Sequence, residues 1–193
     1  MRRTLRLDGS DIDVLRVPFI FQAEKDSLCV PFSLWMCLSY FNGIYENSIV
    51  RKNTPNFNLD EILKLTKTKT LGTIVDTKLI NRLNQSIGSL QFDYNVNCCI
   101  ADLKKRFDKN IPSIVLYDCS YLVYDIPGSN HAGVVVGFDD YRIILNNPWL
   151  GANWYTDIDD FQRSWELEGN RAILIDPITQ DRLEAYLNED RAN

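Results

Sequence analysis

The sequence predicts an α+β fold in which helices come first and an antiparallel β-sheet follows. Two observations favour this class. Apolar residues recur at helical spacing between residues 29 and 108, and short β-branched and aromatic runs follow from residue 113 onward. The length of 193 residues fits one domain. We expect this domain, residues 1–193, to comprise a helical half at about 1–110, a sheet half at about 111–176 and a C-terminal helix at about 178–190.

The central helix is predicted over residues 29–42, CVPFSLWMCLSYFN. Its apolar side chains lie almost all round a helical wheel, which is typical of a helix that is buried on most sides. Pro31 suits the first turn, where a missing N–H costs nothing, and Asn42-Gly43 suits the C-terminal end. Cys29 is therefore expected at the N-terminus of a buried helix.

The other helices of the first half are predicted to be more solvated. One has a short apolar stripe from Leu59 to Leu65, with Asn58 as its N-cap, and a second keeps helical spacing from Val75 to Ile87. A third short helix is expected over residues 100–108.

Four strands are predicted in the second half, each bounded by turn residues. Residues 137–141 between two of them are typical of a tight antiparallel turn, residues 121–128 are expected to form a loop, and a helix is expected from about Asp157 to Trp165. The strands are expected at residues 113–117, 132–138, 142–146 and 172–176.

Composition and charge exclude several classes of protein. The net charge is −5 and no long run of Lys and Arg is present, which disfavours a nucleic-acid partner or a polybasic membrane anchor. No apolar stretch reaches the roughly 18 residues of a membrane span, and the N-terminus lacks the apolar core of a signal peptide. The five cysteines are an odd number and fit free thiols in a reducing compartment. We expect a cytoplasmic protein without membrane insertion, metal or organic cofactor.

The single histidine, His131, gives imidazole chemistry one possible position. A thiol nucleophile needs thiolate character, a base, a group that orients the base and an oxyanion donor. The free N–H groups and dipole of a helix N-terminus stabilise a thiolate, so the pKa of Cys29 is expected to be low. We predict Cys29 as the nucleophile and His131, at the head of a strand, as its base.

Two further side chains complete the predicted set. Asn147 ends the strand that follows His131 after one hairpin, so its amide could accept a hydrogen bond from the imidazole N–H, and Trp149 could shield that bond from water. Gln22, seven residues before Cys29, could aim its amide at the oxyanion beside the Cys29 backbone N–H.

These motifs resemble those of papain-like cysteine peptidases. Residues 130–138, NHAGVVVGF, followed by ILNNPW at 144–149, are similar to the His and Asn motifs of that family. Val17-Pro18 with Gln22, then Cys29-Val30-Pro31, more closely resembles the bacteriocin-processing (double-glycine leader) peptidases and their stand-alone relatives. The resemblance covers about residues 17–42 and 129–176. It implies a papain-like fold in which the buried helix carries the Cys and the sheet carries the His and Asn.

The resemblance also implies the roles of nucleophile for Cys29, base for His131, orienting group for Asn147 and oxyanion donor for Gln22. The chain departs from the family pattern in three ways. The gap from Gln22 to Cys29 is one residue longer than usual, apolar Leu28 and Val30 flank the nucleophile, and Asn147 stands where leader peptidases generally carry Asp.

The leading prediction is hydrolysis of a peptide bond in a protein or peptide substrate. Leu28 and Val30 favour small or apolar residues just before the scissile bond, such as a Gly-Gly or Gly-Ala step. The absence of a signal peptide and a long propeptide argues against a secreted zymogen. Two alternatives stay open: a papain-fold acyltransferase, transglutaminase or deamidase that uses the same thioester chemistry, and a non-catalytic binding module. The sequence leaves the substrate and the oligomeric state open.

Overall fold

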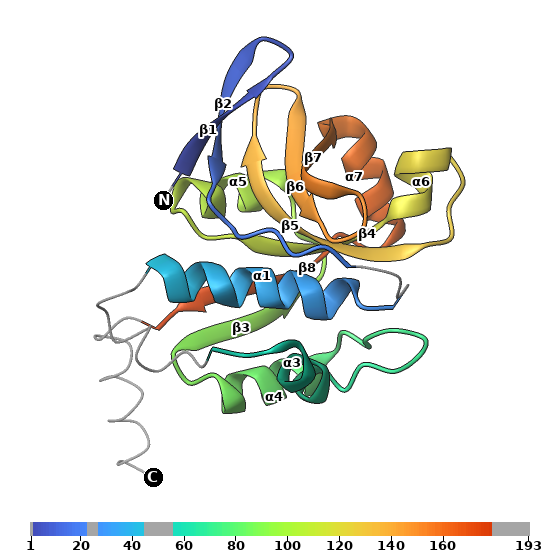
Figure 1. Ribbon diagram of the computed structural model, residues 1–193. Helices are drawn as coiled ribbons and strands as arrows, with labels where there is room; N and C mark the ends of the chain where they lie inside the picture. Colours follow the sequence, from blue (N-terminus) through green and yellow to red (C-terminus); the bar gives the residue numbers. More distant parts are fainter. Residues whose placement is uncertain (1, 23–26, 45–55, 179–193) are drawn as a thin grey trace.

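An eight-stranded antiparallel sheet organises the molecule (Figure 1). The computed structural model describes residues 2–22, 27–44 and 56–178. The strand order is β1-β2-β5-β4-β8-β3, and β5 also pairs with β6, which pairs with β7. The strands are β1 (Arg2–Leu7), β2 (Ser10–Leu15), β3 (Leu90–Asn95), β4 (Ser113–Asp118), β5 (Asn130–Phe138), β6 (Arg142–Asn147), β7 (Gly151–Asp157) and β8 (Arg171–Pro177).

Helices cover both faces of this sheet, and the predicted α+β class is confirmed. Figure 1 shows α1 crossing one side of the sheet with α3 and α4 beyond it, whereas α5, α6 and α7 lie on the other side. The helices are α1 (Cys29–Ile44), α3 (Leu59–Thr66), α4 (Thr77–Ser86), α5 (Ile100–Asp108), α6 (Cys119–Tyr124) and α7 (Ile158–Leu167). Within the described ranges no helix is both long and apolar enough to cross a membrane.

Two apolar cores result, because alternate side chains of a strand point to opposite faces of the sheet. Ile114 of β4 and Val134 of β5 belong to the core beneath α1. Their neighbours Val115 and Val135 belong to the core beneath α7. Strands buried on both faces are largely apolar along their length, which explains why the sequence predicted β4 and β5. The pairing of these two buried strands positions the start of β5, where His131 lies.

Several elements agree closely with the sequence-based expectations. Helix α1 begins at Cys29, has Pro31 in its first turn, and extends two residues beyond the predicted end. Asn58 caps α3 and forms a reciprocal capping box with Glu61. Helix α5 has the predicted bounds, and Asp157 caps α7.

The prediction of a helical half over residues 1–110 is wrong in part, because three strands lie within it. β1 and β2 form a hairpin around Asp8-Gly9, both with positive φ, and β2 joins the sheet where Val14 lies opposite Gly137. An Asp-Gly turn of this kind is a recognisable hairpin signal. β3 pairs with β8, which is distant in the sequence, so local patterning could not place it.

Two corrections apply to the second half. The segment predicted as a loop at 121–128 begins inside helix α6, which Asp118 caps by accepting a hydrogen bond from the Tyr121 N–H. Strand β7 was not predicted. Apart from Ile178, the C-terminal helix expected at about 178–190 lies outside the described residues.

Candidate active site

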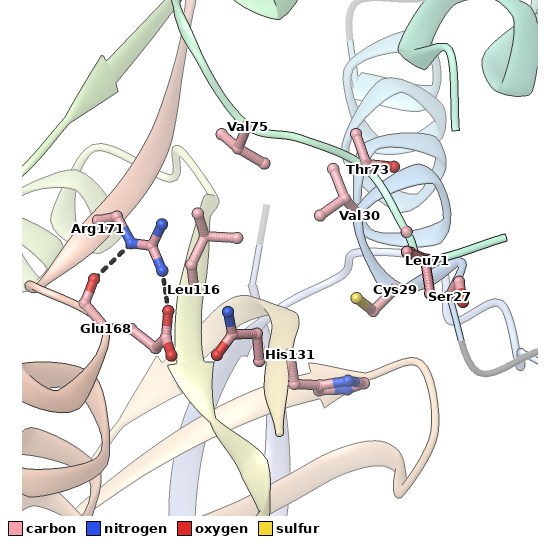
Figure 2. Close-up of a pocket in the computed structure, with 12 residues that line it drawn as sticks. Ser27, Cys29, Val30, Leu71, Thr73, Val75, Leu116, His131, Glu168 and Arg171 are labelled. Carbon is pink, nitrogen blue, oxygen red and sulfur yellow. Dashed lines mark hydrogen bonds and ion pairs between the residues drawn. The ribbon is translucent and has the colours of Figure 1, made fainter. Parts of the chain in front are cut away.

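Cys29 and His131 line the same cavity, which has a volume of about 170 Å³. Figure 2 shows Cys29 at the start of α1 and His131 at the start of β5 bordering one space. The loop between α3 and α4 supplies part of the wall through Leu71, Thr73 and Val75. On another side lie the ion-paired side chains of Arg171 and Glu168.

The thiol of Cys29 is influenced by burial and by backbone N–H groups. Burial is the larger effect and raises the pKa of Cys29, because a thiolate is poorly solvated in the cavity wall. The N–H groups of Ala132, Val30 and Cys29 itself oppose this effect by stabilising the thiolate. The expected low pKa of Cys29 is therefore not found: the helix N-terminus contributes as predicted, but burial outweighs it.

The imidazole of His131 is also buried, with 8% of the residue exposed. Its Nε2 lies 2.9 Å from Oδ1 of Asn147. Burial lowers the pKa of His131 to about 4, and the hydrogen bond to Asn147 opposes part of this effect. At neutral pH the structure therefore favours a neutral imidazole.

Asn147 fixes which nitrogen of His131 carries the proton. The N–H groups of Trp149 and Leu150 each donate to Asn147 Oδ1 over 2.9 Å, and Asn147 Nδ2 donates to the Tyr117 hydroxyl over 2.7 Å. These contacts define the orientation of the amide, so the atom facing the imidazole is an acceptor. Nε2 must therefore donate to it, and Nδ1 retains the lone pair that a base requires.

Tyr117 is a site residue that the sequence analysis missed. It lies on β4 directly opposite His131 and is fully buried. The Tyr117 and His131 rings pack edge to face, with their centroids 5.7 Å apart. Tyr117 thus contacts the imidazole with its ring while its hydroxyl accepts from Asn147. A tyrosine near the end of a mostly apolar strand was the available signal, but the pairing of β4 with β5 was needed to interpret it.

Asp118 is a second residue that the sequence analysis missed. It holds the segment that leads into His131. Its side chain is 3% exposed. Besides capping α6, Asp118 accepts hydrogen bonds from the N–H groups of Gly128, over 2.6 Å, and Ser129, over 3.3 Å. These bonds fix the start of β5, on which the position of His131 depends.

The two remaining predicted residues lie beside Asn147. The Gln22 N–H donates to the Pro148 carbonyl over 2.8 Å, and Gln22 is buried. The Trp149 ring has its centroid 6.4 Å from that of His131 and is 47% exposed, so it borders the imidazole on the solvent side. All five cysteines are free thiols, and Cys37 lies in the core.

The structure thus brings Cys29 and His131 to one cavity, joins His131 directly to Asn147, and attaches the Gln22 backbone to the segment that follows Asn147. A thiol, a base with a free lone pair and backbone N–H groups in one partly enclosed space can carry out acyl transfer through a thioester.

Comparison with known proteins finds one family model and several similar chains. Residues 14–173 match the family model described as Peptidase_C39 like family. A segment of 51 residues, 26% of the chain, is 35% identical to "Uncharacterized protein YvpB" of Bacillus subtilis (strain 168). That segment spans 20% of the length of this curated relative.

Solved structures of three similar chains share the fold. A putative C39-like peptidase from Bacillus anthracis is 17% identical with a TM-score of 0.61, covering 86% of this chain and 98% of that one. A double glycine motif protease from an AMS/PCAT transporter, in complex with the leader peptide, is 18% identical with a TM-score of 0.57, covering 85% and 94%. The peptidase domain of Streptococcus ComA, a bi-functional ABC transporter of a quorum sensing pathway, is 19% identical with a TM-score of 0.55, covering 84% and 99%. These likenesses confirm the papain-like fold.

Proposed function

The chain belongs to the Peptidase_C39 like family, a family of cysteine peptidases, and on this premise we propose that it hydrolyses a peptide bond of a protein or peptide substrate. Cys29 is the nucleophile, His131 the general base and acid, Asn147 the group that orients His131, and Gln22 an oxyanion donor. The observation that carries the proposal is the bond from His131 Nε2 to Asn147, which leaves Nδ1 unprotonated on a residue that lines the same cavity as Cys29.

The first half of the reaction forms a thioester. Nδ1 of His131 takes the proton of the Cys29 thiol as Sγ bonds to the substrate carbonyl carbon, whose oxygen becomes negatively charged. The backbone N–H of Cys29 and the side-chain amide of Gln22 donate hydrogen bonds to that oxygen. The tetrahedral species then expels the amine, which receives the proton from Nδ1, and the acyl group stays on Sγ.

The second half regenerates the enzyme with water. Nδ1 removes a proton from a water molecule as its oxygen attacks the thioester carbon. The carbon–sulfur bond breaks, the proton returns to Sγ, and the acid product leaves.

Burial of both groups supports a resting site that is neutral. A raised pKa at Cys29 and a lowered one at His131 favour the thiol and the neutral imidazole over the ion pair. Proton transfer then accompanies the attack on the carbonyl. Both charges form only as the transition state is approached, where the N–H groups around the sulfur are already oriented.

The size and lining of the cavity support small residues before the scissile bond. A volume of about 170 Å³, bordered by Val30, Val75 and Leu116, suits a Gly-Gly or Gly-Ala step better than a bulky side chain. A double glycine motif is also named for one of the similar solved structures. Free thiols throughout favour the cytoplasm as its location.

Peptide hydrolysis can be tested with a library of unmodified peptides containing Gly-Gly or Gly-Ala in varied contexts. We expect the wild-type protein to produce new termini, detected by mass spectrometry, and the Cys29→Ala protein to produce none. An equal pattern of termini with both proteins would refute the proposal. A mass gain on an amine, or a shift of one mass unit at Gln in an uncut peptide, would replace hydrolysis with transfer or deamidation.

A further inference from the structure

A second, larger cavity opens beside the candidate active site. Its volume is about 620 Å³, and it shares Leu71, Gly72 and Thr73 with the cavity of Cys29 and His131. We call it the loop groove, because it is lined by the loop between α3 and α4 and by the adjoining helix ends. Figure 1 shows this loop projecting toward the N-terminal end of α1. The lining residues outside the shared three are Thr66, Lys67, Lys69, Thr70, Ile74, Asp76, Lys78 and Arg82.

The charge of the loop groove is opposite to that of the whole chain. Three lysines and Arg82 line it against one carboxylate, although acidic residues outnumber basic ones in the sequence, 26 to 21. The carboxylate of Asp76 is already engaged, because it accepts the Leu79 N–H at the start of α4. Among the described residues, none of the four cations forms an ion pair. The lysines are Lys67, Lys69 and Lys78, all exposed.

The groove is held in shape by hydrogen bonds within its own loop. Lys69 and Gly72 exchange backbone hydrogen bonds of 3.1 and 2.9 Å. The hydroxyl of Thr68 lies 2.6 Å from that of Thr73, and the Ser27 hydroxyl donates to the Thr70 carbonyl over 2.6 Å. Because Ser27 lies two residues before Cys29, this last bond connects the groove to the nucleophile. A site ordered in this way needs little rearrangement to bind a ligand.

Two apolar side chains extend from the same loop into solvent. Leu71 at its tip is 100% exposed and Ile74 is 75% exposed. Arg82 Nε donates to the Leu65 carbonyl over 3.2 Å, but none of the four cations is paired with a carboxylate of the described residues. Exposed apolar residues among such cations, next to the candidate active site, indicate a surface that becomes covered when a partner binds.

We propose that the loop groove is a specificity site that binds an acidic segment of the peptide substrate, close in sequence to the scissile bond. Carboxylates of this segment pair with Lys67, Lys69, Lys78 and Arg82, and an apolar side chain of the segment packs on Leu71 and Ile74. The inference rests on the proposed peptidase function, since the segment reaches the groove through the cavity of Cys29. The continuity of the two cavities and the complementary charge carry it.

Binding without cleavage tests the groove separately from the chemistry. Cys29→Ala protein is titrated by calorimetry with Gly-Gly peptides that carry Glu and Asp on one side of the Gly-Gly step, before it in one set and after it in another. Matched peptides carry Gln and Asn at the same positions. We expect one acidic set to bind about tenfold more tightly than its amide counterpart, and the difference to shrink at high salt. Equal binding of acidic and amide peptides, or no binding of either at about 1 mM, overturns the proposal.

Charge reversal locates the effect. The Lys69→Glu/Lys78→Glu variant should lose most of the preference, whereas Lys105→Glu/Lys109→Glu, with the same change in net charge on α5 and its C-cap, should keep it. In the wild-type background the groove variant should raise KM for the acidic peptide about tenfold with little change in kcat, and should cleave the amide peptide normally. Equal losses in the two variants overturn the proposal.

The outcomes separate the groove from the proposed reaction. Acid-selective binding to Cys29→Ala protein without cleavage by the wild type would refute the peptidase proposal and leave the groove in place. Cleavage by the wild type without a preference for acidic peptides would refute the groove proposal and leave the peptidase proposal in place.

Discussion

Protonation of His131 should destabilise the fold by an amount that follows from its burial. The pKa of the ring falls from 6.5 to about 4 on folding, mainly through burial. Between pH 6.5 and about pH 4, the unfolded chain therefore binds a proton on His131 that the folded protein does not bind. This difference in pKa corresponds to roughly 3 kcal/mol of stability, which is present above about pH 6.5 and lost as the pH falls to about 4.

The His131→Gln variant isolates this contribution. Glutamine keeps a side-chain N–H for Asn147 but does not titrate, whereas the carboxylates titrate equally in both proteins. Urea unfolding between about pH 7 and about pH 4.5 should show the wild type losing up to about 1.4 kcal/mol more per pH unit than the variant. Because His131 is the single histidine, its ring pKa can also be read directly by NMR.

Two results would refute the reasoning. Parallel pH dependences of wild type and His131→Gln would show that the ring titrates alike in the folded and unfolded states. A ring pKa near or above about 6.5 in the wild type that falls in Cys29→Ala would show a thiolate–imidazolium pair at rest. The neutral resting site inferred from burial would then be wrong.

Three further substitutions test the surroundings of the imidazole. Asn147→Asp should raise the ring pKa of His131, because a carboxylate 2.9 Å from Nε2 favours the imidazolium, and an NMR titration would show the shift. Tyr117→Phe leaves a buried amide donor of Asn147 without its acceptor, so we expect kcat to fall about tenfold and the unfolding free energy by about 1–3 kcal/mol; unchanged kinetics would remove Tyr117 from the site. Asp118→Ala releases two backbone donors before His131 and should lower the unfolding free energy in urea by about 2 kcal/mol or more.

The parts of the site that the sequence predicted are the ones set by local structure. His131 and Asn147 are 16 residues apart and are joined by one hairpin, so strand patterning and a turn sufficed to bring them together. Cys29 followed from the start of one apolar helix. Tyr117 was missed because its role depends on the pairing of β4 with β5, whose register a short apolar run does not define.

The direction of the Cys29 pKa shift was missed for a related reason. The helix N-terminus is a local feature, and its stabilising N–H groups are present around the sulfur as expected. Burial of the same sulfur depends on segments far away in sequence, including the loop from Leu71 to Val75 that borders the cavity. A sequence pattern reports the first effect and not the second, so it predicted a lower pKa for a thiol whose pKa is raised.

The contrast between buried and exposed groups also separates the proposed chemistry from the selection of the substrate. If both reacting groups are neutral at rest, the cavity itself exerts little long-range force on a charged peptide. The four cations of the loop groove then provide the local attractive field in a chain whose net charge is −5. Salt should therefore weaken the proposed capture of an acidic substrate, as a change in KM, while leaving the proposed proton transfer between Cys29 and His131 within the buried cavity largely unaffected. Recognition and catalysis would in that case respond to different solution conditions, because one depends on exposed charges and the other on buried groups.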